Sequence, residues 1–439
     1  MNTLGATSTR ISQMMAPPYS KLSYLLGVIC SFSVFRLFGL PIFLVVLALM
    51  LLLLVATLSL RIEGHRFLLM MLLSLSVSSA LCFISDIPDS YKQSNTLAAV
   101  TLLAIYLVYS SIGSSGLSCT SDFVNGAIIG FRIQVVWIIL QTIFWSVLSI
   151  DLNDLLFNQI FGMVDQASQF KGSRYIPTGL CWNAGGMVAI LIFGILFDEN
   201  RLWKLGGVLG CVLTQSSTAV IGVICIVLYW VYANFIKYHP LRFKRATIFF
   251  ACVSIAFFLT FLILLPGFIE AIQYYLGYFF ERITQLLFES EGIDSSASAH
   301  LSYYQNLPLV FSEMTAVQRL FGFGLDCSGY IYSLVIGQYA SVASWAVEAD
   351  PINLILSTGI VGTIATYCWI FSMVVKCRNW SGRASVLVVT IIIMGIFYNL
   401  IFVTYCWLVL LLLCVCDTCS SRAADSKLNN RGLIMADRL

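Results

Sequence analysis

Charged residues are scarce in this sequence of 439 residues. Asp, Glu, Lys and Arg make up only 10% of the chain, whereas 59% of its residues are hydrophobic and the mean hydropathy is +0.91. A soluble chain of this length needs far more charged surface. The composition therefore excludes an ordinary soluble protein and indicates an integral membrane protein.

Several motifs of nucleotide and metal chemistry are also missing. The sequence contains no phosphate-binding GxxxxGK[ST], no GxGxxG that opens a helix after a strand, and no HExxH. The sequence therefore contains no recognisable motif for ATP hydrolysis or for zinc binding. No string of acids or histidines runs through the apolar segments, which disfavours an ion pump or a proton-coupled carrier.

Cysteine is plentiful, but its placement predicts neither a metal site nor a disulfide framework. Nearly all of the fourteen cysteines fall within apolar runs, where they serve as small packing residues. The run CVCDTC (Cys414, Cys416 and Cys419) fits no zinc spacing and has no His beside it. Cys327 is the one cysteine clearly in an outer loop, and the sequence offers it no partner there.

Apolar runs of membrane-spanning length recur along the whole chain. A helix needs about 20 apolar residues to cross the hydrocarbon, and lipid cannot satisfy the open backbone of an irregular segment. Two runs are long enough to be helical hairpins, so the sequence predicts an all-α polytopic membrane protein of about twelve transmembrane helices in a single domain, residues 1–439. The runs cover residues 22–38, 40–60, 67–85, 96–114, 123–150, 179–197, 205–236, 246–266, 350–375 and 384–416.

Lys and Arg orient these spans, because positive residues in short loops stay in the cytoplasm. Both termini are therefore expected inside, with residues 417–439 as a cytoplasmic tail, and no cleavable leader is visible in MNTLGATSTR. The cations of the cytoplasmic side are Arg10, Lys21, Arg61, Arg66, Arg201, Lys204, Lys237, Arg242, Lys244, Arg245, Lys376, Arg378, Arg383, Arg422, Lys427, Arg431 and Arg438.

Two long loops are expected on the opposite face. Residues 151–178 form the first periplasmic loop and residues 267–349 the larger second one. Long loops in compact membrane proteins usually carry function. The second is expected to be partly helical, with helices in YYLGYFFERITQLLFES and SSASAHLSYYQNLPLVFSEM and a glycine-rich turn in LFGFGLDCSG.

Few basic side chains are available for chemistry in these loops. Lys171 and Arg174 lie where the first loop becomes the next span, and Arg282 and Arg319 are the only Lys or Arg residues of the large loop, where His300 lies among serines and tyrosines. Each also has an ordinary explanation. Lys171 and Arg174 can reach lipid headgroups, Arg282 can pair with a neighbouring Glu, and His300 can be a surface residue.

Two carboxylates stand in front of an apolar helix in the stretch EADPINLILSTGIVG. Pro351 presets the first helical turn, and acids complement the positive end of a helix dipole. Capping accounts for one of the two carboxylates, Glu348 and Asp350, but does not require both. At least one of them is therefore a candidate for acid–base work at the rim of an outward-facing cavity.

The order of these segments resembles the O-antigen polymerase and ligase family. RYIPTGLCWNAGG, LTQSSTAVIGVICIVL, a long outer loop, RLFGFGL and EADPINLILSTGIVG follow one another, over roughly residues 170–370, as the motifs of that family do. The resemblance implies a GT-C-like helical membrane enzyme of the bacterial inner membrane. Such an enzyme polymerises undecaprenyl-diphosphate-linked oligosaccharide repeat units into a surface polysaccharide, an O-antigen or a related glycan.

Within that family, the details favour a polymerase. Ligases typically carry an Arg after QS, where this chain has Ser217, and a His-Asn pair, where it has Ile352 and Asn353. His300 stands where an Arg is expected after the serine cluster of the loop. An acid eleven residues before the GIVG glycine, here Glu348, is more like a polymerase.

The resemblance also implies the partners. These are the lipid-linked oligosaccharide, the bilayer and a chain-length regulator in the membrane, with no nucleic acid and no cofactor. An O-antigen ligase and a lipid-linked oligosaccharide flippase or other transporter stay open as alternatives. A flippase should carry polar residues within its spans and show two related halves, whereas this sequence puts its charge outside them.

The implied chemistry suits the cations. A diphosphate leaving group gains charge as the glycosidic bond breaks, and planar guanidinium groups stabilise it by bidentate contact. Arg174 and Arg282 are the first choices, and Lys171 and Arg319 are further candidates to bind the diphosphate.

The same chemistry needs a general base. Glu348, Asp350 or His300 would take the proton of the acceptor hydroxyl. Attack opposite the diphosphate inverts the anomeric centre, and no metal is needed where arginines stabilise the charge.

Overall fold

The computed structural model describes most of the chain. It covers residues 17–32, 36–37, 40–60, 66–114, 117–162, 169–171, 174–181, 183–214, 216–232, 295–336, 347–378, 382–401 and 407–419. Only the backbone is described for Lys171, Arg174 and His300. The expected span at 246–266, the expected helix at 274–290 and residues 420–439 of the tail lie outside the described residues.

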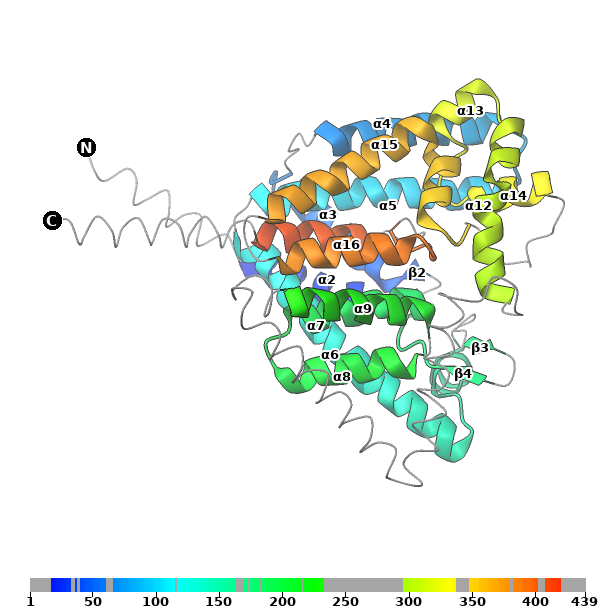
Figure 1. The fold of residues 1–439 in the computed structure, drawn as a ribbon. Coiled ribbons are helices and arrows are strands. Elements are labelled where there is room, and N and C mark those ends of the chain that lie inside the picture. Colours follow the sequence, from blue (N-terminus) through cyan, green and yellow to red (C-terminus); the bar gives the residue numbers. More distant parts are fainter. Residues whose placement is uncertain are drawn as a thin grey trace, which may run out of the picture.

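The described chain is almost entirely helical, as Figure 1 shows. Its strands form two short antiparallel hairpins, and the second hairpin lies with a π-helical turn (η1) inside the expected first periplasmic loop. The elements are α2 (Pro17–Cys30), β1 (Arg36–Leu37), β2 (Leu40–Pro41), α3 (Ile42–Ala56), α4 (Arg66–Ile84), α5 (Asp89–Ser114), α6 (Leu117–Leu148), η1 (Asp154–Ile160), β3 (Gln169–Lys171), β4 (Arg174–Ile176), α7 (Ala184–Phe197), α8 (Arg201–Leu213), α9 (Ser217–Val231), α12 (Ser295–Glu313), α13 (Ala316–Phe321), α14 (Ser328–Ile336), α15 (Asp350–Arg378), α16 (Arg383–Gly395) and the helix Trp407–Cys419.

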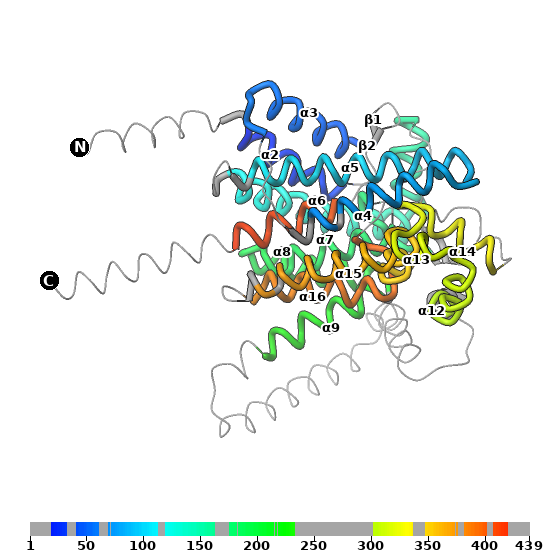
Figure 2. Tube along the Cα trace, turned by 90° about the horizontal axis from the view of Figure 1, so that it is seen from above, coloured from blue at the N-terminus to red at the C-terminus, as the bar shows by residue number. Residues whose placement is uncertain are grey.

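Three of the described helices are long and apolar enough to cross a membrane. They are Asp89–Ile112 of α5, Cys119–Leu148 of α6 and Asp350–Met373 of α15. Shorter apolar helices of 10–17 residues accompany them. Figure 2 shows α7 in the middle of the bundle, with α3 and α9 on opposite sides. The predicted all-α class is confirmed, and the helix lengths suit a membrane protein.

Both long runs predicted as hairpins are divided into two helices. The run 205–236 overlaps α8 and α9, and the run 384–416 overlaps α16 and Trp407–Cys419. The helices α8, α9 and α16 have 13, 15 and 13 residues. At 1.5 Å per residue each is roughly 20 Å long, which is shorter than the hydrocarbon core of about 30 Å.

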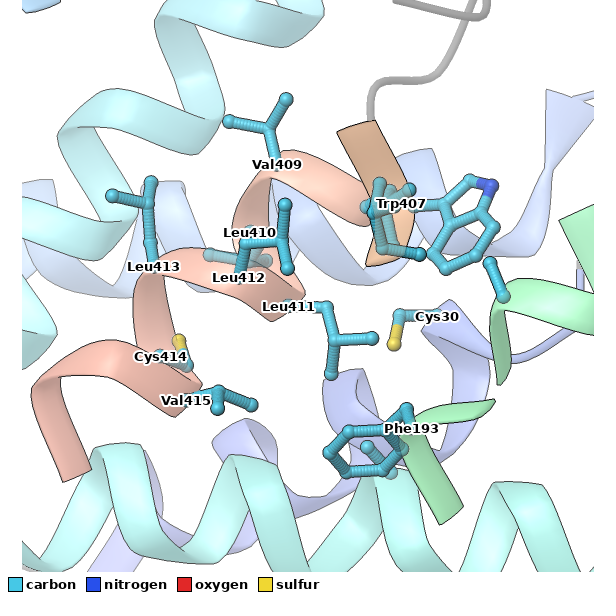
Figure 3. Close-up of a cluster of buried hydrophobic side chains, with 14 of the residues drawn as sticks. Cys30, Phe193, Trp407, Val409, Leu410, Leu411, Leu412, Leu413, Cys414 and Val415 are labelled. Carbon is cyan, nitrogen blue, oxygen red and sulfur yellow. The ribbon is translucent and has the colours of Figure 1, made fainter. Parts of the chain in front are cut away.

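The core of the bundle is built around the helix Trp407–Cys419. All residues from 407 to 416 are buried, as is α7 from Met187 to Leu196. Figure 3 shows the side chains of this helix next to Cys30 of α2 and Phe193 of α7. A helix that is apolar on all sides is expected to be enclosed by others, and this one is.

Glycines bring α2 and α6 into backbone contact. A Cβ on Gly27 would collide with the carbonyl of Phe123, and a Cβ on Gly126 would collide with the carbonyl of Tyr24. Small residues at a crossing allow helices in membranes to approach closely. The contact fixes α6, from which the glutamines described below reach the candidate site.

Candidate functional site

The bundle has two ends with different polar groups. At the end to the right in Figure 1, α4 stops, α5, α7 and α15 begin, and β3, β4 and α12 to α14 are gathered. We call it the candidate-site end, because the described candidate residues lie there. At the opposite end α7 stops and α8 and α16 begin, and we call it the ion-pair end.

The β3–β4 hairpin carries two of the predicted cationic residues. Lys171 and Arg174 are partners in its antiparallel register. Tyr175 fastens the hairpin, since its ring stacks on Trp145 of α6 with centroids 4.7 Å apart and its hydroxyl donates to Asp151 Oδ1 at 3.3 Å. The two cationic residues therefore share one short hairpin at the end of α6.

Asp151 is a residue that the sequence analysis missed. Its Oδ1 also accepts hydrogen bonds from the backbone N–H groups of Asn153 and Asp154, at 3.1 and 3.3 Å. Its buried Oδ2 has no partner among the described residues. Burial raises the pKa of this carboxyl, against the hydrogen bonds that lower it. Its position as the first residue of the outer loop was the only sequence signal available.

The segment TGLC is held by polar side chains of α6 and of the loop after it. Gln134 Oε1 accepts from the N–H of Leu180 at 2.7 Å, and Gln141 Oε1 accepts from the N–H of Gly179 at 2.8 Å. Asn153 Nδ2 donates to the carbonyl of Gly179 at 2.9 Å. Because these groups are buried, the segment TGLC has a fixed path.

The two predicted carboxylates at the start of α15 have different surroundings. Asp350 is only 2% exposed, and its carboxylate accepts from the N–H of Leu400 at 3.0 Å and of Ile401 at 3.2 Å. Asp350 was expected to cap α15, whereas its carboxylate accepts hydrogen bonds from the turn after α16. Glu348 is half-buried. Burial, followed by the charge of Glu348, raises the pKa of Tyr303 to about 12.

Helix α12 passes the start of α15. Burial, and then the charge of Asp350, raises the pKa of Tyr304 on this helix to about 12, and its hydroxyl donates to the carbonyl of Ile396. His300 lies about one turn earlier on the same helix. The helix predicted in SSASAHLSYYQNLPLVFSEM is therefore confirmed, and Tyr303 and Tyr304, about one turn after His300, lie close enough to the two carboxylates to feel their charge.

The glycine-rich turn before α14 docks onto a break in α15. Gly359 has φ +66° and ψ −172°, which interrupts the helix. The N–H of Phe323 donates to the carbonyl of Leu356, and the N–H of Gly324 to that of Ser357, both at 2.9 Å. Two segments that carry the resemblance, RLFGFGL and EADPINLILSTGIVG, thus bind each other although the chain separates them.

A buried polar network extends from this break. Asn353 Oδ1 accepts from the hydroxyls of Ser328 and Ser357 at 2.6 and 3.1 Å, and Asn353 Nδ2 donates to Asn399 Oδ1 at 3.3 Å. Ser328 and Asn399 were not predicted, because neither stands near the carboxylates in the sequence. The network ties α14, α15 and the turn after α16 together.

The turn after α16, residues 396–401, also contacts the segment WNAGG. Asn183 caps α7 by accepting from the N–H of Gly186 at 2.7 Å. A Cβ on Gly185 would lie 2.5 Å from the ring of Tyr398. The residues after Arg174 and those after Glu348 therefore both contact residues 396–401.

The guanidinium of Arg319, one of the predicted diphosphate ligands, is engaged by backbone carbonyls. Arg319 donates from Nε to the carbonyl of Phe311 at 2.9 Å and from Nη2 to that of Ser312 at 2.7 Å, so its guanidinium caps the end of α12. Arg282 lies outside the described residues. No three His, Cys, Asp or Glu side chains gather as metal ligands in the described part of the chain.

The ion-pair end holds a cluster that the sequence analysis did not assign. Arg132 Nε lies 2.7 Å from Asp198 Oδ2, and Nη2 lies 3.0 Å from Oδ1. Burial alone would raise the pKa of Asp198, but the hydrogen bonds from Arg132 and from the N–H of Asn200, and the charges of Arg132 and Lys204, bring it below the usual value. The ion pair lines a cavity of about 710 Å³, whose other lining residues are Tyr24, Val124, Asn125, Ile128, Ile129, Phe197, Glu199, Arg383, Val415, Thr418 and Cys419.

No protein-family model and no curated protein matches this sequence. The class that the described residues define is an all-α protein with helices of membrane-spanning length.

Proposed function

We propose that this chain is a membrane glycosyltransferase that polymerises oligosaccharide units carried on undecaprenyl diphosphate. The observation that carries the proposal is the meeting of the segments that resemble the family. The hairpin with its following TGLC and WNAGG, the GFG turn, and the helix behind Glu348 all gather at the candidate-site end, and two of them contact residues 396–401. If these motifs matched the family only by chance, the segments would not be expected to lie together in space.

The proposal includes a topology. The candidate-site end faces away from the cytoplasm, both termini lie in the cytoplasm, and about twelve helices span the bacterial inner membrane. Arg201 and Arg383 begin α8 and α16 at the opposite end, which supports this orientation because cytoplasmic loops carry more positive charge. A chain-length regulator in the same membrane would then meet the chain within the bilayer.

In the proposed reaction, the acceptor hydroxyl attacks the anomeric carbon of the lipid-linked sugar. A bond forms between the acceptor oxygen and that carbon, the bond to the diphosphate oxygen breaks, and the configuration inverts. Glu348 takes the hydroxyl proton, with His300 as the alternative base, because Asp350 is engaged by backbone N–H groups. Arg174 and Lys171 stabilise the diphosphate from the hairpin, and Arg282 is a further ligand.

The test is the length distribution of the polysaccharide in cells that depend on this chain. Glu348→Gln and Arg174→Lys should each leave single-unit product in place of the ladder. The matched control is Glu313→Gln, since Glu313 is exposed at the far end of α12 and should leave the ladder intact. Unaltered ladders with Glu348→Gln and Arg174→Lys would refute the proposal, and long chains stranded on the lipid carrier would indicate a ligase.

A transporter of lipid-linked oligosaccharides is the second candidate, and the cavity at the ion-pair end favours it. Asn125 lines this cavity and is exposed, so Asn125→Trp would obstruct it without disturbing the core. A transporter would then export no units at all. A polymerase would keep its normal ladder.

A further inference from the structure

Two thiols from distant parts of the chain meet at the candidate-site end. Cys82 Sγ lies 3.6 Å from Cys327 Sγ, and 245 residues separate the two along the sequence. Both side chains are fully buried. The sequence offered Cys327 no partner in the outer loops, and the neighbouring thiol belongs instead to α4, inside a predicted span, where loop sequences give no sign of it.

Contacts with neighbouring segments hold the backbone around Cys82 and Cys327 in place. Cys82 stands two residues before the end of α4, and Cys327 directly precedes α14. A Cβ on Gly324 would lie 3.1 Å from the Cβ of Cys82, so the glycine-rich turn lies against α4. Ser94 of α5 donates to Asp326 Oδ2 at 2.8 Å. The close approach of the thiols thus follows from the packing of whole segments.

A covalent bond needs only a small further movement. Disulfide sulfurs lie about 2.05 Å apart, so the two Sγ atoms must approach by about 1.5 Å. Rotation about the Cα–Cβ bonds supplies such a shift while the helices keep their places. Disulfides persist on the oxidising side of a membrane and are rare in the cytoplasm. The outward orientation proposed above places this pair on the oxidising side.

We propose that Cys82 and Cys327 form a disulfide bond that fastens the glycine-rich turn to α4. The oxidant is a thiol oxidase with a reactive disulfide, met outside the cytoplasm while the chain folds. One thiolate attacks that disulfide, the second thiol resolves the mixed disulfide, and the oxidase leaves with two thiols that carry the two protons. The proposal depends on the orientation of this end and is independent of the glycosyl transfer.

The bond would join the two halves of the candidate-site end. The turn that contains Cys327 also binds the break in α15 through the N–H groups of Phe323 and Gly324. A covalent link to α4 therefore holds α4 and α5 against α15, the helix that begins with Asp350. The candidate site would then keep its arrangement when a large lipid-linked substrate enters and leaves.

Thiol mapping of the full-length protein tests the proposal directly. Protein made in bacteria with an active export oxidation pathway is treated with N-ethylmaleimide in denaturant without reductant, digested and analysed by mass spectrometry. The expected result is a linked peptide pair containing Cys82 and Cys327 that disappears on reduction, while Cys119 and Cys211 carry the label. Complete labelling of both Cys82 and Cys327 would overturn the proposal.

Thermal unfolding in detergent gives an independent test. A reductant should lower the unfolding midpoint of the wild-type protein by several degrees, and Cys82→Ser or Cys327→Ser should abolish that response. Cys211→Ser is the matched control, because Cys211 is equally buried in α8 and should keep the response. A midpoint that reductant leaves unchanged in all four proteins would contradict the bond.

The proposed disulfide and the proposed reaction can be refuted independently of each other. If the linked peptide is found but Glu348→Gln keeps the full polysaccharide ladder, the proposed reaction fails and the disulfide stands. If both thiols are free and Glu348→Gln yields single units, the disulfide fails and the reaction stands.

Discussion

The two ends of the bundle use their carboxylates differently. At the ion-pair end, Asp198 receives two hydrogen bonds from the guanidinium of Arg132, so opposite charges meet directly. At the candidate-site end, Asp350 receives backbone N–H groups and Glu348 keeps part of its surface exposed beside Tyr303. The difference teaches that one carboxylate of a neighbouring pair can fix the local backbone while the other keeps part of its surface exposed.

The largest effect is expected where the candidate-site end depends on a broken helix. Gly359→Ala forces a Cβ at φ +66° into the backbone of Leu320 and should cost roughly 3 kcal/mol or more. Gly162→Ala is the matched control, since Gly162 has φ +62° but nothing within 4 Å, and it should cost about 1 kcal/mol. The yield of monodisperse protein on size exclusion measures both. Equal yields would show that the contact with Leu320 has no importance.

The next effect separates the two neighbouring carboxylates. Asp350→Asn weakens charge-assisted hydrogen bonds to the buried N–H groups of Leu400 and Ile401 and should destabilise the protein by about 2 kcal/mol. Glu348→Gln should change stability by less than about 0.5 kcal/mol while it abolishes polymerisation. Thermal unfolding and the polysaccharide ladder measure the two effects. A stable, inactive Asp350→Asn would reverse the assignment.

A similar loss is expected at the ion-pair end, but without loss of the ladder. Arg132→Met leaves the buried Asp198 without its cation and should cost about 2 kcal/mol, towards the lower end for a buried pair because the Arg132 side chain is 33% exposed. Asp198→Asn in the same chain should restore part of that loss. A double-mutant cycle measures the coupling, and strict additivity would mean that the two groups do not interact energetically.

The smallest effects are opposite pH dependences of the two ends. The folded-state pKa of Asp198 is below its unfolded value, so its contribution is present above the unfolded pKa and is lost as pH falls through the folded pKa. The pKa values of Tyr303 and Tyr304 are raised to about 12, so their contribution is present below the unfolded value of about 10 and is lost between there and 12.

The unfolding midpoint followed against pH checks both limbs. Asp198→Asn should reduce the slope of the acid limb alone, and Tyr303→Phe should reduce the slope of the alkaline limb alone, to which Tyr304 still contributes. A variant that changed both limbs would mean that the two ends are coupled through the bundle.

Composition and local pattern were sufficient to predict the helical class, the division of the run 205–236, the helix α12 and the turn before α14. These features depend on hydropathy, on turn residues and on short-range spacing, which a sequence displays directly. The bonds from Asp350 to residues 400–401 could not be predicted in this way. They join segments fifty residues apart, and no local rule specifies which backbone groups a carboxylate will meet.

Long-range packing explains the other differences. Arg132 lies in the middle of α6, whereas its partner Asp198 follows the last residue of α7, and the pairing depends on how α6 and α7 cross. Cys82 looked like one more packing residue of an apolar run until the turn with Cys327 was placed against it. Asp151 has only its position in the loop to distinguish it, because its environment arises from Tyr175 and the end of α6.

The enclosed position of the helix Trp407–Cys419 has a consequence for biogenesis. This segment is the last of the described helices to be synthesised, and yet it occupies the centre. The earlier helices are therefore made before the helix that they enclose, so their packing around it is completed only after this segment has been synthesised. Pairing of the first helices alone leaves this core incomplete, because its central side chains come from the segment that is made last among the described helices.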